Sequence, residues 1–293
     1  MMNFVRKMGW RLIVAILLTG WATLFLPVNL SLWTFSNIAE TSLVSSLVFG
    51  LIVGFLLKRF RWIEHIDTWI HEFGHAAVGT FFGGVPESIK LNRDTSGVTS
   101  SRFRKLTRFK SIFISAAGPL ATVVSLYLCI RLAAKGLSFV ILPILAVIVL
   151  IVLISTVRSA WGWLVGILVW AGITFSFAAS QFPVFGFFNS SAKEIFLGAI
   201  LGAASGVALR ASISRLRMHG GDGDEGNIAH HLRVPEILVD LTILVMHVAI
   251  IWSTLSFLNV VPRVSELVSS SPEFQIKFQE ITTWIQSLPI WKK

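Results

Sequence analysis

Long apolar runs separated by short polar segments follow one another along most of the chain. Runs of this kind predict membrane-spanning helices, because about 20 mostly apolar residues are needed to cross the hydrocarbon core of a bilayer. The predicted spans are Leu12–Leu26, Ser42–Leu57, Ile112–Leu132, Leu137–Ser155, Ala160–Phe177, Glu194–Leu209 and Ile237–Leu258. The first run resembles a signal sequence, but no cleavage site of small residues follows it, so we expect a retained span with its N-terminus in the cytoplasm. In the sixth run, Gly198, Gly202 and Gly206 recur at every fourth position, which favours close packing against another helix.

One predicted helix differs from the others because it is rich in ionisable residues. It covers Trp62–Phe82 and is ended by Gly83-Gly84 and Pro86. Its ionisable members are Glu64, His65, Asp67, His71, Glu72 and His75. Ionisable groups at membrane depth are costly and usually face a protein interior or a wet cavity. We therefore expect the other helices to surround this one.

The segment from Val85 to Lys110 is the most polar part of the chain interior. Ser88–Asn92 and Gly97–Ser100 alternate in polarity like two short strands, with a turn over Asp94–Gly97, so a β-hairpin is predicted. The segment also carries the basic residues Lys90, Arg93, Arg102, Arg104, Lys105, Arg108 and Lys110. Because short cytoplasmic loops are enriched in lysine and arginine, this segment is expected on the cytoplasmic side.

A second polar loop, Arg210–Pro235, is also rich in arginine. Four predicted crossings separate it from the first polar loop, so both loops lie on one side of the membrane and their residues can meet. At the front of the chain, the basic cluster Lys58–Arg61 and the first polar loop both favour the cytoplasm, although the Trp62–Phe82 helix lies between them. Either that helix enters the membrane and returns, or one basic cluster departs from the rule.

These elements predict an all-α polytopic membrane protein. We expect a bundle of about 7–8 transmembrane helices around the embedded Trp62–Phe82 helix, with a short β-hairpin loop after it. The chain divides into two N-terminal spans (1–60), a membrane core (61–258) and a C-terminal tail (259–293). Apolar residues at helical spacing predict that the tail is amphipathic and lies along the surface.

Composition agrees with a membrane location. Of the 293 residues, 54% are hydrophobic and 14% are charged, whereas soluble domains contain about 25% charged residues. The net charge of +10 is concentrated in short clusters beside apolar runs, which fits orientation in a lipid bilayer and not the binding of nucleic acid. The single cysteine, Cys129, excludes an intrachain disulfide and a cysteine-ligated metal site.

The polar helix contains the sequence His71-Glu72-Phe73-Gly74-His75. Two histidines four residues apart lie on one face of a helix, so both imidazoles can reach a single ion. Catalytic zinc usually takes three protein ligands and one water, whose pKa it lowers towards neutrality. Glu72 projects from the same turn and can accept a proton from that water. The pattern predicts a zinc site with a general base beside it.

The third ligand has to come from a distant part of the chain. The segment Met218–His231 lies in the second polar loop and combines acidic residues, histidines and glycines, which let a carboxylate approach an ion closely. The candidates in this segment are Asp222, Asp224, Glu225, His219, His230 and His231. Donor chemistry alone does not choose among them.

Several further motifs give the chain a resemblance to a known family. They are His71-Glu72-Phe73-Gly74-His75-Ala76, Gly83-Gly84, Gly97-Val98-Thr99, Ala117-Gly118-Pro119, Val157-Arg158-Ser159-Ala160-Trp161-Gly162, and Asp224 followed by Ile228-Ala229, Leu232 and Pro235. Together they resemble the site-2-protease-like family of membrane zinc metallopeptidases, particularly its bacterial M50B-like branch. One departure is Thr122, because the wider family often has asparagine a few residues after Gly-Pro.

The resemblance implies a zinc metallopeptidase in which His71 and His75 bind Zn²⁺, Glu72 is the catalytic base and Asp224 is the third ligand. Asp222, which precedes a glycine, could instead match the ligand of the wider family and stays open as an alternative. The implied reaction is hydrolysis of a peptide bond in a membrane protein substrate, at or within the lipid bilayer of a bacterial plasma membrane. The alternative function is that of a catalytically inactive membrane scaffold or metal-handling protein that retains the fold.

Other residues receive supporting roles. A helical substrate hides its carbonyl groups, so one hypothesis is that the 85–100 hairpin offers an edge strand that holds the substrate extended; the alternative is a purely structural hairpin. Asp67, one turn before His71, either orients the histidine ring or is a carboxylate at the helix end or membrane interface. Asp240 and His247 share one face of the last span and are expected to point into the bundle, where they pair with buried groups or line a water route.

Overall fold

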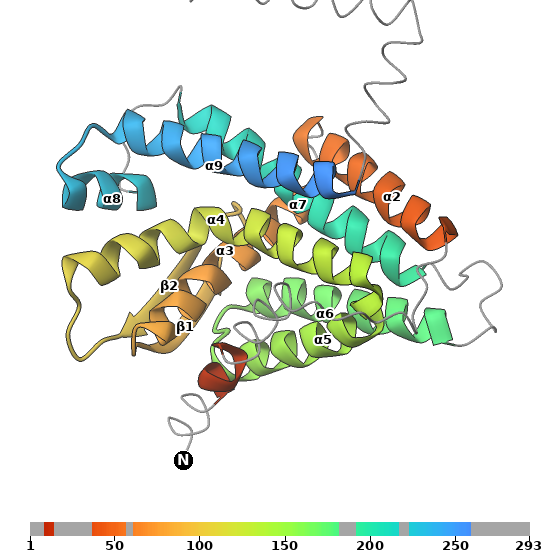
Figure 1. Ribbon diagram of the computed structural model, residues 1–293. Coiled ribbons are helices and arrows are strands. Elements are labelled where there is room, and N and C mark those ends of the chain that lie inside the picture. The colour runs from red at the N-terminus through yellow and green to blue at the C-terminus, as the bar shows by residue number, and fades with distance from the viewer. Residues whose placement is uncertain (1–8, 15–36, 57–60, 182–191, 217–222, 259–293) are drawn as a thin grey trace, which may run out of the picture.

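The computed structural model describes residues 9–14, 37–56, 61–181, 192–216 and 223–258 as a mostly helical protein (Figure 1). The elements are α2 (Asn37–Leu56), α3 (Arg61–Phe81), β1 (Val85–Leu91), β2 (Gly97–Arg102), α4 (Arg108–Leu132), a π-helical turn (Ala133–Leu137), α5 (Ser138–Ser155), α6 (Ala160–Gln181), α7 (Ala192–Arg215), α8 (Asp224–Leu232) and α9 (Glu236–Phe257). Residues 9–14 are also helical. The predicted polar helix and hairpin are thus both present, and they are α3 and β1–β2.

Five helices, α4, α5, α6, α7 and α9, are individually long and apolar enough to cross a membrane. Counting α2 and α3 as one span bent by 103° gives a sixth. These helices confirm a multi-pass membrane protein, with five to six candidate spans among the described residues. The predicted first span Leu12–Leu26 lies almost entirely outside the described residues, as does the tail 259–293.

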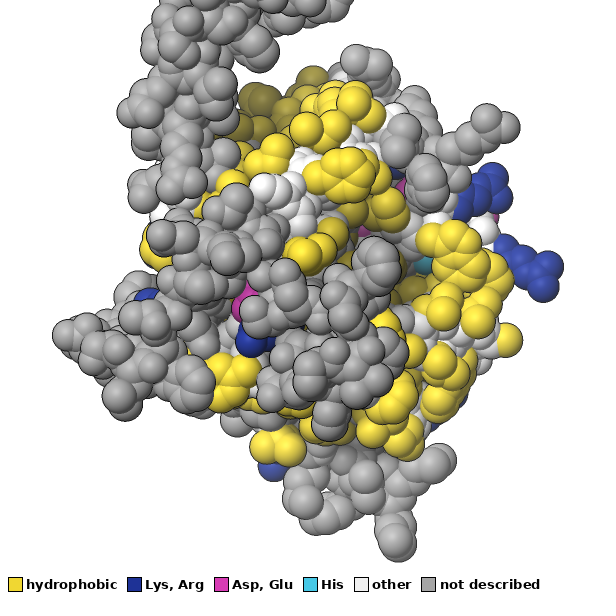
Figure 2. All heavy atoms as spheres, turned by 90° about the vertical axis from the view of Figure 1, so that its right-hand side faces the viewer, with side chains coloured by type: hydrophobic (Ala, Val, Ile, Leu, Met, Phe, Trp, Pro, Cys, Tyr) yellow, Lys and Arg dark blue, Asp and Glu magenta, His cyan; other side chains and the backbone are white. Residues whose placement is uncertain are grey.

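The exterior of the bundle is apolar. On the face drawn in Figure 2, the described side chains are mostly hydrophobic and charged groups are few. On α9, Val245, Val248 and Trp252 are each at least half exposed. Large exposed hydrophobic surfaces are uncommon on soluble monomers, so this surface is suited to contact with lipid.

Close contact between α2 and α7 confirms the packing role predicted for the α7 glycines. A Cβ added at Gly202 would lie 2.5 Å from the Leu47 carbonyl oxygen. Added Cβ atoms at Gly198 and Gly206 would meet the α2 backbone at similarly short distances. Glycine therefore allows the two helix backbones to touch, which is the usual way that membrane helices gain packing contacts.

The polar helix α3 packs closely against α4. A Cβ at Gly74 would lie 2.6 Å from the Ala117 carbonyl oxygen, so only glycine allows this approach. On another side, the Thr68 hydroxyl donates to the Thr95 carbonyl at 2.7 Å and ties the hairpin turn to α3. The polar helix is therefore covered by protein on these two sides, as the cost of exposing its ionisable residues to lipid favours.

The hairpin has one covered edge and one open edge. Strands β1 and β2 are antiparallel, with Ile89 opposite Thr99. The Ile89 N–H donates to the Thr156 carbonyl at 2.9 Å, and its carbonyl accepts from the Arg158 N–H at 3.0 Å. The outer edge of β1 is thereby covered by the α5–α6 loop. Within the described residues, no strand pairs with the outer edge of β2.

Candidate metal centre

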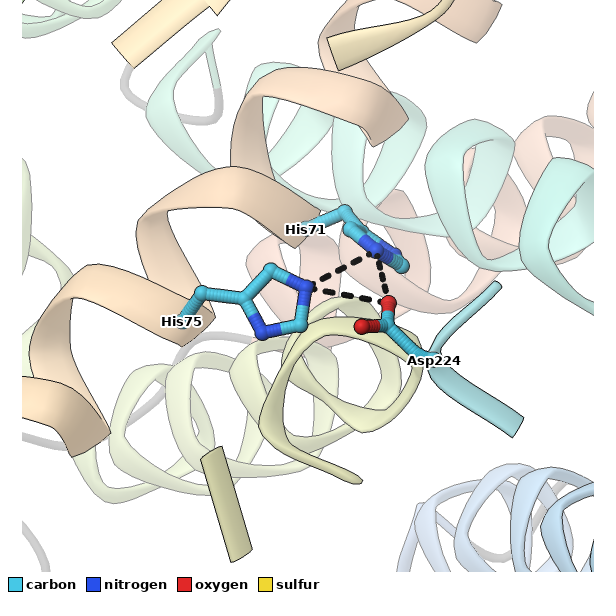
Figure 3. Close-up of side chains that lie close together, drawn as sticks. All are labelled: His71, His75 and Asp224. Atoms are coloured by element: carbon cyan, nitrogen blue, oxygen red, sulfur yellow. Dashed lines mark hydrogen bonds and ion pairs between the residues drawn. The ribbon is translucent and has the colours of Figure 1, made fainter. Parts of the chain in front are cut away.

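Two turns of α3 and the first residue of α8 bring three side chains together. His71 and His75 project from one face of α3 towards Asp224 (Figure 3). The Asp224 Oδ2 atom lies 2.9 Å from His71 Nε2 and 3.0 Å from His75 Nε2. The two Nε2 atoms are 3.2 Å apart. Among the described residues, this is the one group of three histidine, cysteine or acidic side chains that could hold a metal ion.

The spacing and chemistry of the three donors fit zinc. Ligands at about 2.05 Å from a tetrahedral ion lie about 3.3 Å from one another, and the three separations between the donor atoms are within a few tenths of an ångström of that value. His75 Nδ1 donates to the Ile114 carbonyl at 2.6 Å, which leaves a lone pair on His75 Nε2, the atom that faces the other donors. A carbonyl partner of this kind commonly fixes a metal-binding histidine in the required tautomer.

Asp224 is held by the packing of α8. It is the first residue of the helix and follows Gly223, which has an extended backbone. The next residue, Glu225, is buried and forms an ion pair with Arg215 of α7. Burial opposes ionisation of Asp224, but the adjacent His71 and His75 rings favour its charged form and hold its pKa well below the ordinary value of an aspartate. The carboxylate is therefore charged and ready to bind a cation.

Glu72 is buried between α3 and the hairpin. Its side chain is 5% exposed. A Cβ added at Gly97, where β2 begins, would lie 2.7 Å from Glu72 Oε1. The Thr99 hydroxyl donates to the Glu72 carbonyl at 3.0 Å. The hairpin therefore lies directly against the carboxylate that the sequence predicts to be the catalytic base.

Gly118 of α4 makes room for the two histidines. A Cβ at this position would lie 2.2 Å from His75 Nε2 and 2.7 Å from His71 Nε2. We expect a Gly118→Ala variant to bind zinc at least about tenfold more weakly, because the rings cannot keep their positions beside a methyl group. The measurement is zinc content and affinity of the purified full chain.

The matched control for this prediction is Gly79→Ala on α3. There an added Cβ would meet only the Phe103 ring, at 3.3 Å, and the Ser101 hydroxyl, at 3.7 Å. This variant should retain zinc. Equal zinc affinity in the two variants would contradict the assignment of the donors beside Gly118.

The structure gives Asp67 a partner that the sequence did not predict. Asp67 Oδ1 accepts a hydrogen bond of 2.6 Å from the Thr122 hydroxyl. Thr122 is the position at which the chain departs from the wider family pattern. No hydrogen bond joins Asp67 to His71 within the described part of the chain, so orientation of His71 by Asp67 stays a prediction.

The other acidic and histidine candidates that the structure describes lie elsewhere. Asp222 and His219 fall outside the described residues. Glu225 pairs with Arg215, and His231 Nε2 lies 3.0 Å from the Ser111 hydroxyl. Asp240 and His247 are 6% and 1% exposed, and they face the bundle interior from α9.

Two contacts around the site involve residues that the sequence did not single out as partners. The Trp161 indole N–H donates to His65 Nε2 at 2.7 Å and holds the start of α6 against α3. Arg210 of α7 forms an ion pair of 2.7 Å with Glu64 of α3. Trp161 belongs to one of the quoted motifs, which was the available signal for the first contact. Nothing local in the sequence indicated the second.

The fold and these side chains define a polytopic membrane protein in which two histidines of the polar helix α3 face a carboxylate of α8. The chain belongs to the Peptidase M50B-like family, which it matches over residues 41–254. Membership of this family implies a membrane metallopeptidase, and the family is zinc-dependent. No curated protein and no solved structure matches the chain.

Proposed function

We propose that this protein is a zinc metalloendopeptidase that hydrolyses a peptide bond of a membrane protein at or within the bilayer. His71, His75 and Asp224 would hold the ion, and Glu72 would act as the catalytic base. The observation that carries the proposal is the convergence of the three donor atoms within 4.8 Å of one another, one residue away from a buried glutamate. A metal-binding scaffold has no need of that glutamate.

The proposed chemistry divides between the ion and the side chains. When bound, zinc polarises the scissile carbonyl and makes water a stronger acid. Glu72 accepts the proton of the attacking water on its carboxylate and later passes it to the nitrogen of the leaving amine. Because Glu72 is buried where α3 packs against β2, few other water molecules can reach it and take this proton. His75 keeps its Nε2 lone pair available because Nδ1 donates to Ile114.

We place the peptidase core in residues 61–258, with two N-terminal spans in 1–60 and an amphipathic tail in 259–293. The family match begins at residue 41, so α2 belongs to the matched region although it precedes this core. The proposed bundle of about 7–8 transmembrane helices counts the five single spans, α2 and the predicted first span, with α3 as a separate eighth helix. Asp222 remains the alternative third ligand, and Asp67 the residue proposed to orient His71.

A trapping experiment tests the proposal. The full-length Glu72→Gln variant, expressed in membranes, should retain a membrane protein substrate that it binds and cannot cleave. The wild-type protein in liposomes should then cleave the captured protein, and removal of zinc by a chelator should stop cleavage until zinc is restored. Cleavage that continues without metal would overturn the proposal.

The open edge of β2 is proposed to hold the substrate. Because the main chain of Ile89 faces Thr156, Ile89 and Thr99 form a non-hydrogen-bonded pair of the hairpin ladder. The N–H and carbonyl of Thr99 therefore point to the open side. A substrate strand pairing there would run extended beside Glu72.

Thr99→Pro should lower the cleavage rate about tenfold, because it removes the outward N–H that would pair with the substrate. The ladder to β1 should survive, since that N–H takes no part in it and proline is tolerated on such an edge. Thr99→Ala is the control, because it removes the same hydroxyl contact to Glu72 but keeps the N–H. Initial cleavage rates in liposomes measure the difference, and equal rates for the two variants would argue against strand pairing.

A further inference from the structure

A polar pocket lies at the C-terminal end of α8, and Asp224 lies at the other end of this helix. Its volume is about 470 Å³, and it is lined by Arg108, Ala229, His230, His231, Arg233 and Val234. These residues come from the first turn of α4, the last turn of α8 and the connection to α9. The three helices meet at one end of the bundle (Figure 1). The candidate metal centre makes no use of these residues.

The charge in this pocket is unbalanced. Arg108 and Arg233 have no carboxylate within 4.0 Å in the part of the chain that the structure describes. By contrast, Arg102, Arg210 and Arg215 each pair with a glutamate. Two exposed guanidinium groups and two imidazoles around one hollow form a site for an anion, and guanidinium groups match the oxygen geometry of phosphate.

Both arginines occupy positions where the local backbone favours another residue. Arg108 is the first residue of α4, whose first turn contains no acidic residue. A cation at the positive end of a helix dipole is unfavourable, whereas an anion bound there is stabilised. Arg233 ends α8 with φ of 60°, a left-handed conformation that usually selects glycine. A bound anion gives both side chains a favourable partner.

Exposed apolar residues lie close in sequence to the residues that line the pocket. Leu106, Phe109, Leu232 and Leu238 are each 50–60% exposed. The candidate membrane spans α4 and α9 begin at Arg108 and Glu236, so the pocket lies where these two helices leave the membrane. Cationic pockets between helices at this level suit lipid headgroups. A free phosphate ion would gain nothing from these exposed apolar residues.

We propose that this pocket binds the phosphate of an anionic phospholipid, with the headgroup between Arg108 and Arg233 and the acyl chains along the exposed faces of α4 and α9. On α9, this face continues through Leu241 and Val245, which are 47% and 58% exposed. The proposal does not depend on the peptidase activity. Because α8 carries Asp224 at its other end, the lipid also anchors the helix that supplies the third donor.

The test measures lipid binding to the purified full chain in neutral detergent by native mass spectrometry. The probes are dioctanoyl phosphatidylglycerol, which is anionic, and dioctanoyl phosphatidylcholine, which carries no net charge, with inorganic phosphate as a competitor. We expect the anionic lipid to bind at least about tenfold more tightly than the zwitterionic one, and an equal concentration of inorganic phosphate to leave it bound. Equal binding of the two lipids would overturn the proposal, and displacement by equal inorganic phosphate would assign the site to the free ion.

Two variants locate the site. Arg108→Gln and Arg233→Gly should each weaken phosphatidylglycerol binding about fivefold. Arg233→Gly should not lower the melting temperature, because glycine relieves the left-handed backbone at that position, so its loss of binding cannot be attributed to unfolding. The control is the double variant Arg104→Gln and Lys105→Gln, two exposed cations of the same segment that do not line the pocket, and its affinity should stay within about twofold. A control loss as large as that of the pocket variants would show diffuse surface attraction and overturn the site.

Discussion

The Glu72→Gln variant is expected to lose peptide hydrolysis while keeping its zinc. Glutamine has nearly the same size and shape as glutamate, so the packing between α3 and the hairpin should survive. It cannot accept the proton of the attacking water, and loss of a positioned general base typically lowers a rate by about 100- to 10,000-fold. The measurements are the rate of substrate cleavage in liposomes and the zinc content of the same preparation.

Glu87→Gln provides a control on the hairpin itself. Glu87 pairs with Arg102, its side chain is 34% exposed, and exposed pairs contribute little stability. This variant should cleave at nearly the wild-type rate. If the Glu72→Gln variant instead replaced the wild-type protein in the cell with no change in its biological effect, the protein would be better explained as a catalytically inactive scaffold or metal-handling protein.

The membrane spans were predictable because each depends on a local property, a run of apolar residues. Helix ends were less predictable. The helix α4 begins at Arg108, four residues before the apolar run from Ile112, and α7 continues to Arg215, well beyond Leu209. Hydropathy marks the part of a helix that suits lipid. The helix itself extends beyond that part, as α4 does to its N-cap Thr107.

The pairing of the two histidines was also a local inference, since residues four apart on a helix share a face. The partner from α8 was not. Whether Asp222, Asp224 or Glu225 approaches the histidines depends on how α8 docks, and α8 is held by the pairing of Glu225 with Arg215 and by contacts with α4 and α9. Likewise, the bridge between Ile89 and Val157 joins segments that share no local pattern. Donor chemistry in the sequence therefore defined the candidates, and long-range packing selects among them.

Removing the Asp224 carboxylate should release the metal. In the Asp224→Ala variant, His71 and His75 are the two remaining donors, and loss of one of three protein ligands is expected to weaken zinc binding by more than about 100-fold, because even loss of a residue that only supports a ligand costs 10- to 100-fold. Zinc content after dialysis of the purified full chain, and affinity from chelator competition, measure the effect. The ion pair of Glu225 with Arg215 does not involve Asp224, so α8 should remain docked and the protein folded.

The matched control is Asp222→Ala, two residues earlier in the same acidic segment. We expect this variant to bind zinc as tightly as the wild type, because the structure brings Asp224 to within 3.0 Å of both imidazoles. The opposite result, with zinc lost from Asp222→Ala and kept by Asp224→Ala, would make Asp222 the third ligand and require α8 to rearrange when the metal binds. Full zinc retention when both residues are alanine would mean that neither residue is a ligand. The assignment of one ion to ligands from both α3 and the acidic segment at α8 would then be wrong.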